Sequence, residues 1–285
     1  MVDIMFHCNE KSNFHQGYSA RAFTYTDYSI PMHSHDFYEV NIILSGTGTH
    51  CIEKGRFRVR CGDVFVIPPM VAHAYTDTDK LEVYHILLLK SFVEENKEET
   101  QQVKGFLQLT EIEPFLRSSF SNAFFLHLSQ LQLLQLKNEL KFIDDNGSFS
   151  WEECALMKYH TIWKLLYWFS GLLDDQINSG YTLLKDKYEV QIIKSLEYIH
   201  KCYAEKITID SLCKTVFLSR STFLRSFQEI CGISPIEYLN RYRCKKAIEQ
   251  LLFADSSKTE IAHNCGFYDL SHMERILKKY RSYRY

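Results

Sequence analysis

Four side chains near the N-terminus have the chemistry of metal ligands or of a polar binding pocket. His33 and His35 are separated by one residue, Glu39 follows four residues after His35, and His73 lies further along the chain. Two histidines one residue apart on a strand project from the same face. Three imidazoles and one carboxylate suit a divalent transition metal with open positions for a small molecule. The same side chains would also line a metal-free polar pocket, and both roles remain open at this point.

A second group of polar residues has the chemistry needed to contact DNA. In segment 208–231, Thr208 is a good N-cap for one helix and Ser219 for the next, with a turn at 216–218 between them. The apolar residues of the second helix share one side, so its short polar side chains and arginines face the other way. Such side chains read base edges and contact phosphates. The candidate DNA-binding residues of this helix are Ser219, Arg220, Ser221, Thr222 and Arg225.

The helix-turn-helix pattern occurs a second time, at 258–280. Ile261 and Ala262 are packing residues of its first helix, and Gly266 stands where the turn needs a permissive backbone. The apolar stripe of its second helix comprises Leu270, Met273, Ile276, Leu277 and Tyr280. The candidate DNA-binding residues beside that stripe are Ser271, His272, Arg275 and Lys278. Two such units, joined by one helix that starts at Pro235, can reach two successive major-groove segments of one duplex.

Charge divides the chain in the same way as these patterns. Residues 190–285 contain 16 Lys and Arg against 10 Asp and Glu, whereas residues 1–189 contain 17 against 25. The formal net charge of −2 therefore combines a basic module with an acidic one. For either unit alone, a plain helical bundle with a solvated basic face is the alternative. Because the basic charge coincides with two helix-turn-helix patterns, we expect phosphate contacts with double-stranded DNA.

Short strands must position the histidines and the glutamate. Between about 19 and 89, segments rich in Val, Ile, Phe and Tyr alternate with turns that contain Gly, Pro, Asp and Lys. Strands this short and evenly spaced predict an antiparallel barrel or jelly roll. The predicted strands are 39–44, 48–53, 57–60, 63–67 and 83–89.

The region from about 91 to 188 has a helical pattern. A helix predicted at 124–143 carries Leu126, Leu133 and Leu140 seven residues apart, which is the spacing of a short coiled coil. An amphipathic helix that packs on its own barrel explains the same pattern.

A second helix is predicted at 152–173 and is rich in aromatic residues. It contains Lys158, His160 and Lys164, so it does not have the sequence of a membrane span. Residues 174–180 are predicted to form a flexible connection to the basic module.

Residues 190–285, about a third of the chain, resemble the DNA-binding domain of the AraC/XylS family of bacterial regulators. The matching positions are Cys213, Ser219, the Phe-Leu-Arg-Ser-Phe run at 223–227, Gly232, the Ser-Pro-Ile-Glu-Tyr-Leu run at 234–239, Arg243, Lys246, Ala247, Leu251, Leu252, Glu260, Ile261, Ala262, Gly266, Phe267, Ser271, Lys278, Lys279 and Tyr280. The sequence departs from the family where Cys213 replaces the usual alanine and where Met273 and Leu277 replace buried aromatics.

The segment around His33 resembles the first part of the cupin motif, which continues through Glu39 to Gly46. The matches to the second part are Gly62, Pro68 and His73, and Met70 stands at its usual glycine position. In metal-binding cupins the matching residues converge on a metal inside the barrel. In AraC-type regulators the segment that matches 31–39 belongs to an effector-sensing domain. The resemblance therefore implies an effector site at His33, His35, Tyr38, Glu39 and His73, with no required cofactor. If a divalent metal binds, the resemblance implies His33, His35, Glu39 and His73 as its ligands.

Several protein classes are not supported by the sequence. Nine cysteines are an odd number and include no CxxC pair, which favours reduced thiols in a cytosolic protein over a zinc finger or a disulfide framework. The N-terminus lacks the residue order of a signal peptide. No phosphate-binding glycine loop and no nucleophile motif is present.

The sequence predicts an α+β chain. Its parts are an N-terminal antiparallel β-barrel (a cupin-like jelly roll) at 1–92, a helical connector at 93–188, and an all-α DNA-binding domain with two helix-turn-helix units at 189–285. We expect a cytoplasmic, homodimeric, ligand-responsive transcription regulator of metabolic and in particular carbohydrate genes, which is not an enzyme. Its expected partners are double-stranded DNA, a small-molecule effector and, if it activates, RNA polymerase; no membrane is expected. The alternatives are a cupin metalloenzyme fused to a DNA-binding module and a constitutive DNA-binding protein whose barrel only dimerises.

Overall fold

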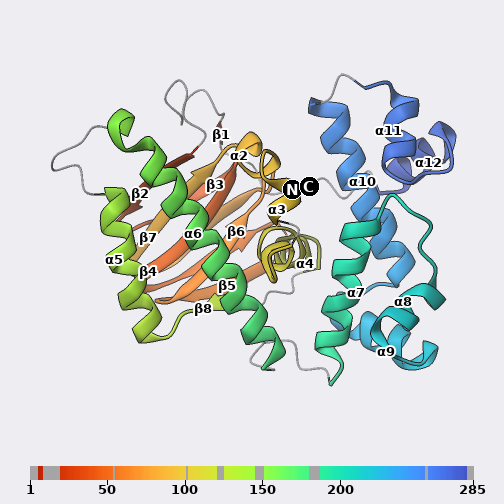
Figure 1. The fold of residues 1–285 in the computed structure, drawn as a ribbon, viewed down its shortest axis with the longest axis horizontal. Helices are drawn as coiled ribbons and strands as arrows, with labels where there is room; N and C mark the ends of the chain where they lie inside the picture. The colour runs from red at the N-terminus through yellow and green to blue at the C-terminus, as the bar shows by residue number, and fades with distance from the viewer. Residues whose placement is uncertain are drawn as a thin grey trace. The chain divides into compact units, whose positions relative to one another are not determined.

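A computed structural model describes residues 6–8, 20–53, 55–100, 102–120, 125–144, 151–179, 187–253 and 256–280. The chain divides into two compact units, residues 1–181 and 182–285, whose elements are labelled in Figure 1. The first unit combines an antiparallel sheet with helices, and the described part of the second is helical. The predicted α+β class is therefore confirmed. The helices of the predicted connector belong to the first unit up to Asn178. The three-segment division of the chain stays a prediction.

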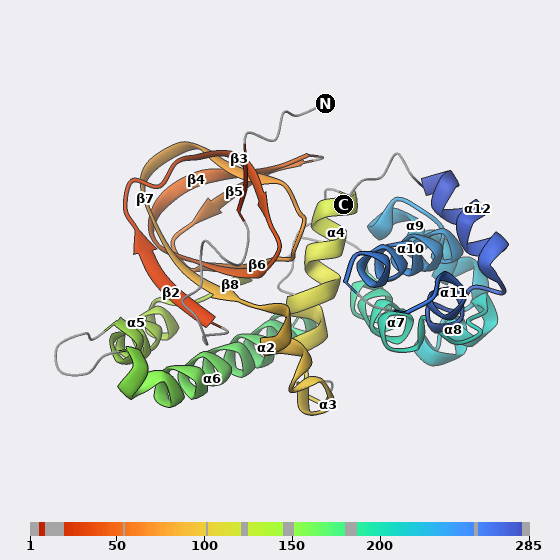
Figure 2. The same cartoon turned by 90° about the horizontal axis from the view of Figure 1, so that it is seen from above.

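The strands of the first unit form one mostly antiparallel sheet, which curves into a barrel (Figure 2). The long strands β4 and β7 pair with each other; β5 and β6 pair with β4, and β2 and β3 pair with β7. The strands are β1 (Phe6–Cys8), β2 (Ala20–Tyr25), β3 (Ile30–His35), β4 (Tyr38–Ile52), β5 (Gly55–Arg60), β6 (Asp63–Ile67), β7 (His73–Leu88) and β8 (Leu126–His127).

Two of the predicted strands, 39–44 and 48–53, are parts of the single strand β4. The pairing of β4 with β7 shifts register around Gly46, whose φ is 72°. A β-carbon at Gly46 would stand 2.2 Å from the carbonyl oxygen of Lys80. Glycine therefore allows the strand to bend through an irregular stretch instead of ending there. The other predicted strands fall in β5, β6 and β7.

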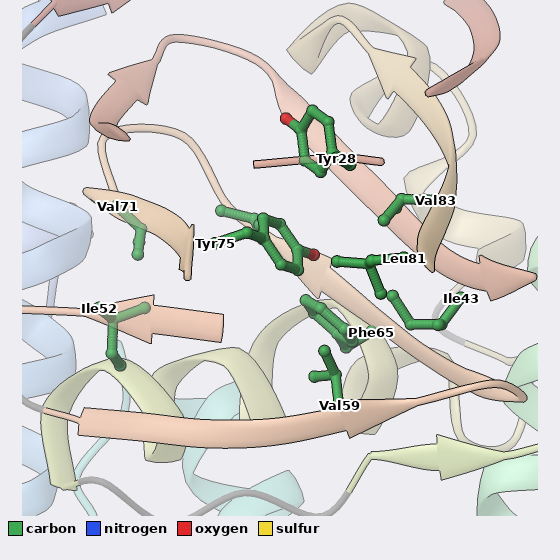
Figure 3. Packing of buried hydrophobic residues seen from close by; sticks show 10 residues of the cluster. Tyr28, Ile43, Ile52, Val59, Phe65, Val71, Tyr75, Leu81 and Val83 are labelled. Carbon is green, nitrogen blue, oxygen red and sulfur yellow. The ribbon is translucent and has the colours of Figure 1, made fainter. Parts of the chain in front are cut away.

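Apolar side chains fill part of the barrel interior (Figure 3). They come from several strands and from the segment between β2 and β3, and the ring centroids of Tyr28 and Tyr75 lie 5.2 Å apart. The cluster comprises Tyr28, Ile43, Ile52, Val59, Phe65, Ile67, Val71, Tyr75, Leu81 and Val83. Burial of this apolar surface is the main force that holds the strands in register, and these strands carry the polar residues described below.

Helices cover the barrel, and Figure 2 shows α5 and α6 beside it. The helices are α2 (Lys90–Glu94), α3 (Lys97–Thr100), the π-helix η1 (Gln108–Ile112), α4 (Glu113–Phe120), α5 (Gln130–Asp144) and α6 (Trp151–Asn178). Arg117 fixes α4 to the barrel. Its Nε donates to Glu113 Oε1 over 2.9 Å, and its Nη2 donates to the carbonyl oxygen of Val66 on β6. Both charged side chains are buried.

The predicted helix at 124–143 is wrong at its start. Leu126 lies in β8 opposite Val64 of β6, and the helix α5 begins only at Gln130. The His127 Nδ1 lies 2.8 Å from Asp63 Oδ1, which ties the segment to the start of β6. Leu126, Leu133 and Leu140 therefore do not form one helical stripe.

The flexible connection predicted at 174–180 is also wrong where the structure describes it, because α6 continues to Asn178. Two hydrogen bonds of the Gln176 side chain stabilise this last turn of α6. This side-chain amide donates to the Phe125 carbonyl oxygen over 2.9 Å and accepts from the His127 backbone N–H over 3.0 Å. The predicted helix at 152–173 is confirmed and is longer than predicted.

The second unit contains both helix-turn-helix patterns. Its helices are α7 (Glu189–Cys202), α8 (Ile209–Val216), α9 (Arg220–Cys231), α10 (Pro235–Phe253), α11 (Lys258–Asn264) and α12 (Leu270–Tyr280). In α12, Met273, Ile276 and Tyr280 are buried, with Leu270 and Leu277 packed partly against the same core. The predicted apolar stripe is thus confirmed.

Among the helices that the structure describes, none is both long enough and apolar enough to cross a membrane.

Candidate functional site

Three strands bring His33, Glu39 and His73 together in the first unit. His33 on β3 stands opposite His73 on β7, and their ring centroids lie 4.1 Å apart. Glu39 comes from β4, which also pairs with β7. One candidate ligand atom from each of the three residues lies within 4.8 Å of those of the other two, and all three residues are buried. These residues form a donor set that spans three strands.

His35 lies at the same cluster and contacts the glutamate. Its Nε2 is 3.1 Å from Glu39 Oε2, and its ring centroid is 5.1 Å from that of His73. Tyr38 is not brought to the cluster. It precedes Glu39 on β4, and successive strand residues face opposite sides of a sheet.

The three clustered histidines are oriented by backbone carbonyl groups. The Nδ1 atoms of His33, His35 and His73 lie 3.0, 2.7 and 3.1 Å from the carbonyl oxygens of residues 31, 37 and 71. Because a carbonyl oxygen only accepts, each Nδ1 carries a proton, and in the neutral rings of His33 and His73 the Nε2 presents a lone pair. Histidines that bind metals through Nε2 are commonly oriented in this way.

Two further residues, which the sequence analysis did not identify, hold the other carboxylate oxygen of Glu39. Asn41 Nδ2 donates to Glu39 Oε1 over 2.9 Å, and His85 Nδ1 lies 2.8 Å from the same atom. Asn41 could have been found, because it lies two residues beyond Glu39 and so on the same face of the strand. Nothing in the local sequence marks His85, which is 46 residues away from Glu39.

His50 and Tyr75 continue the polar lining inside the barrel. The His50 and His73 ring centroids are 5.9 Å apart, and the His50 and Tyr75 centroids are 5.2 Å apart. Both ring nitrogens of His50 and the Tyr75 hydroxyl are buried. None of these three groups has a hydrogen-bond partner among the described residues. Buried polar groups without partners are costly, so they mark a place where a ligand or water would be held.

The electrostatics of the cluster favour an ionised Glu39 beside neutral rings of His33 and His73. Burial lowers the pKa of His73 well below its ordinary value, and burial also lowers the pKa of His33. Burial opposes ionisation of Glu39, but hydrogen bonds from His35 and His85 hold its pKa well below the ordinary value. Two imidazole nitrogens and one carboxylate oxygen are donors that a divalent transition metal accepts. The buried Nε2 of His73 has no hydrogen-bond partner among the described residues, so the residues present fit such an ion.

The predicted DNA-binding residues of the first helix-turn-helix unit lie at the start of α9. Ser221 and Arg225 are exposed and Thr222 is half-buried. Ser219 is the N-cap, whose Oγ accepts from the Thr222 N–H over 3.3 Å. Arg220 is exposed and forms an ion pair of 2.7 Å with Asp210 on α8. Ser221 Oγ lies 3.3 Å from Ser219 Oγ. Arg225 is therefore the exposed residue of this set without such a local contact among the described residues.

The corresponding residues of the second unit lie on α12. Ser271, Arg275 and Lys278 are exposed. His272 is half-buried, and its Nδ1 accepts from the Tyr268 N–H over 3.2 Å. Three of these residues, Ser271, His272 and Arg275, line a hollow together with Tyr268 and Asp269.

The two turns have matching hydrogen bonds. The Leu218 N–H donates to the Cys213 carbonyl oxygen over 3.2 Å, and the Phe267 N–H donates to the Ala262 carbonyl oxygen over 2.9 Å. The residue before each donor has a positive φ, 55° at Phe217 and 75° at Gly266. The predicted permissive position at Gly266 is thus confirmed.

Part of the positive charge of the second unit is structural. Arg243 on α10 is buried, and its guanidinium donates to the carbonyl oxygens of Tyr203 and Glu205 over 2.7 Å each. Arg241 pairs with Glu237 over 2.6 Å. Both arginines are anchored within the second unit, which leaves the exposed residues of α9 and α12 to reach DNA.

Comparison with known proteins identifies both units. The model of the AraC-like ligand binding domain matches residues 16–140, and that of a helix-turn-helix domain matches 212–283. The transcriptional activator RhaS of Enterobacter sp. strain 638 is 26% identical over 255 residues, which cover 88% of this chain and 84% of the relative. RhaS of Escherichia coli strain SE11 is 26% identical over 253 residues, which cover 87% and 84%.

Among solved structures, ToxT from Vibrio cholerae is 13% identical, with 91% of this chain and 93% of that chain covered at a TM-score of 0.37. The DNA-binding domain of AdpA in complex with a target DNA is 25% identical, with 33% and 96% covered at a TM-score of 0.29.

A ligand-binding barrel and a module with two helix-turn-helix units define a ligand-responsive, DNA-binding transcription regulator. The predicted resemblance to regulators of the AraC/XylS family is confirmed. The similarity is to transcription activators and not to enzymes, so the metalloenzyme alternative is not favoured.

Proposed function

We propose that a small molecule binds at the cluster of His33, Glu39 and His73 and thereby changes how the second unit binds promoter DNA. The observation that carries this proposal is a buried polar cluster inside the ligand-binding barrel, in which the Nε2 of His73 has no hydrogen-bond partner among the described residues. Aromatic rings and unpartnered polar atoms of His50 and Tyr75 adjoin it. Such a lining suits a hydroxyl-rich molecule, and we propose a sugar or a related metabolite.

The first experiment is selection of source-genome DNA fragments by the full-length protein at near-physiological salt, followed by sequencing. Two enriched half-sites about one helical turn apart are expected if both helix-turn-helix units read one face of the duplex. The genes beside the enriched site would then supply effectors to test. Effector action requires two states that the effector binds with different affinity, so a correct effector must change the measured affinity for DNA. Equal affinity with every effector suggested by those genes would contradict the proposal.

Arg225 is the residue proposed to read a base in the first half-site. Arg225→Ala should weaken specific binding by about 1–3 kcal/mol and relax the preference at one base pair. Arg225→Lys keeps the charge but not the two-pronged donor geometry. It should therefore restore non-specific affinity without restoring the preference. Unchanged affinity and preference in Arg225→Ala would remove Arg225 from the interface.

We also propose that the protein is a homodimer that acts in the cytoplasm and, as an activator, contacts RNA polymerase. On α5, Leu131 and Leu134 are 68% and 58% exposed, which supports this helix as the dimer contact. Leu131→Glu with Leu134→Glu should convert the dimer to a monomer in sedimentation measurements. A matched pair of changes at exposed polar positions of α5, Gln135→Glu and Asn138→Glu, should leave it dimeric.

A further inference from the structure

We infer that the ring of Tyr268 reads a thymine in the second half-site by packing against the 5-methyl group of that base. Tyr268 lies in the turn before α12 and is not one of the predicted DNA-binding residues. The inference goes beyond the proposed function, because it assigns a base contact to one residue and requires no response to an effector.

Tyr268 is a large aromatic residue that the free protein leaves in solvent. It is 85% exposed, and its side chain has no hydrogen bond, ion pair or ring contact with other described residues. Its backbone N–H donates to His272 Nδ1 over 3.2 Å, a contact that any residue at this position can make. An aromatic ring offers a large apolar surface at a small cost in side-chain entropy, which is why such rings are common in binding surfaces. The ring is therefore available to a partner.

The two helix-turn-helix units differ at this position. Tyr268 and Ser219 each directly follow the residue whose N–H closes the turn. Ser219 is the N-cap of α9. In the second unit the corresponding contact is made one residue later, where the His272 N–H donates to Asp269 Oδ1 over 2.7 Å. The side chain of Tyr268 is therefore not needed to begin α12.

Tyr268 begins the row of predicted DNA-binding residues on α12. It lines one hollow together with Asp269, Ser271, His272 and Arg275, and Ser271 and Arg275 are exposed. Seven residues separate Tyr268 from Arg275, which corresponds to about 10 Å along a helix axis or about three base-pair steps. We therefore expect Tyr268 to contact a base within about three base pairs of the one that Arg275 contacts.

The chemistry of the hollow favours a base edge over a phosphate. Its two charged side chains, Asp269 and Arg275, have opposite signs, and the carboxylate would repel a phosphate. The thymine 5-methyl group is the apolar feature that base edges present in the major groove. An aromatic ring can bury that methyl group without a hydrogen bond, which leaves Ser271 and Arg275 for polar base edges. A protein partner at Tyr268 is the rival interpretation, and it predicts no effect of the ring on DNA binding.

The test measures the affinity of the full-length protein for the site enriched by DNA selection, with one thymine of the second half-site at a time replaced by uracil. Uracil lacks the 5-methyl group and keeps the hydrogen-bonding edge of thymine. At one position, uracil should weaken wild-type binding about fourfold, the effect expected for one buried group of this size. Tyr268→Ala should weaken binding to the thymine site by a similar factor and should not distinguish thymine from uracil at that position. This loss of coupling between a ring and a methyl group identifies a direct contact.

Two further variants separate the ring from the hydroxyl and from exposed aromatic residues in general. Tyr268→Phe keeps the ring and should keep the wild-type preference for thymine. Phe217→Ala is the matched control, because Phe217 is 94% exposed in the turn of the first unit and is not among the residues that line the hollow. It should keep the wild-type preference at the second half-site. All three substitutions are at exposed side chains, so equal thermal unfolding temperatures are expected and check that each variant is folded.

Several outcomes would overturn the inference. Additive losses from Tyr268→Ala and from every uracil substitution would show that the ring does not contact a methyl group. Equal losses in Tyr268→Phe and Tyr268→Ala would indicate a hydroxyl contact with a phosphate instead. Wild-type affinity in Tyr268→Ala would indicate a protein partner, and an enriched second half-site without a preferred thymine would leave the ring no base to read.

These outcomes are separate from those of the proposed function, because each is measured without an effector. Loss of the thymine preference in Tyr268→Ala, in a protein whose DNA affinity no effector changes, would support the role of Tyr268 and contradict the proposed function.

Discussion

Phe217 has an unusual backbone for an aromatic residue. Its φ is 55° and 94% of its side chain is exposed, whereas the matching turn residue of the second unit is Gly266. A side chain in the left-handed region costs about 1–2 kcal/mol, and glycine costs about 0.5–1 kcal/mol of unfolded-state entropy. Phe217→Gly should therefore leave the second unit equally stable or stabilise it by about 1 kcal/mol in urea unfolding followed by far-UV circular dichroism.

Val216→Gly, one residue earlier, is the control. Val216 is buried in α8, so this change removes core packing and helix propensity and should be strongly destabilising. A loss of more than about 1 kcal/mol in Phe217→Gly would contradict the prediction. It would mean that the exposed ring makes a stabilising contact.

Residue types and spacing were sufficient to find His33, His35, Glu39 and His73, because a motif and strand alternation determine where these side chains point. The role of His85 depends on the pairing of β4 with β7 through registers that shift several times. No local pattern encodes such shifts. Tyr38 lies beside Glu39 in the same motif, but successive strand residues face opposite sides of a sheet, so its part in an effector site stays a prediction.

Helix α4 depends on a buried ion pair for its position on the barrel. Arg117 donates to Glu113 on its own helix and to the carbonyl oxygen of Val66 on β6. Arg117→Ala leaves Glu113 as an uncompensated buried charge and should destabilise the first unit by about 3–5 kcal/mol. The measurement is urea unfolding followed by tryptophan fluorescence, because every tryptophan of the chain lies in α6.

The double substitution Glu113→Leu with Arg117→Met is the matched control. It removes both charges and keeps similar volumes, so it should cost much less than Arg117→Ala alone. Equal losses in the single and double variants would show that packing of the arginine, and not the ion pair, fixes α4.

Elements were predicted best where local signals agree with tertiary contacts. The N-caps Thr208 and Ser219 begin α8 and α9 as predicted, since capping hydrogen bonds lie within a few residues of one another. The start of α5 and the end of α6 were predicted wrongly because contacts with residues far away in the sequence determine them. Leu126 pairs with a distant strand, and Gln176 bonds to the segment beside it. Long-range contacts of this kind override helical spacing.

For the whole molecule, the uneven charge is the property with the clearest consequence. The basic module of residues 190–285 lies in a chain whose remainder is acidic. Counterions are released from each phosphate that the module neutralises. The logarithm of the affinity for DNA therefore falls linearly with the logarithm of the salt concentration, with a slope of about −0.9 per phosphate contact. With at least about six phosphate contacts, affinity for the selected site should fall about 10³-fold or more between about 50 and 200 mM salt.

A substitution at Lys278 tests whether the second helix-turn-helix unit contributes to that salt dependence. It is exposed on α12, so Lys278→Gln should weaken binding to all sequences alike and reduce the slope by about one. Lys137→Gln, an exposed change on α5 of the first unit, should leave the slope unchanged. Fluorescence anisotropy of labelled DNA across a salt series measures both. If Lys278→Gln has the wild-type slope, the second helix-turn-helix unit does not touch phosphates at that residue. If Lys137→Gln lowers the slope as well, the acidic unit contributes to the DNA interface, which its net charge opposes.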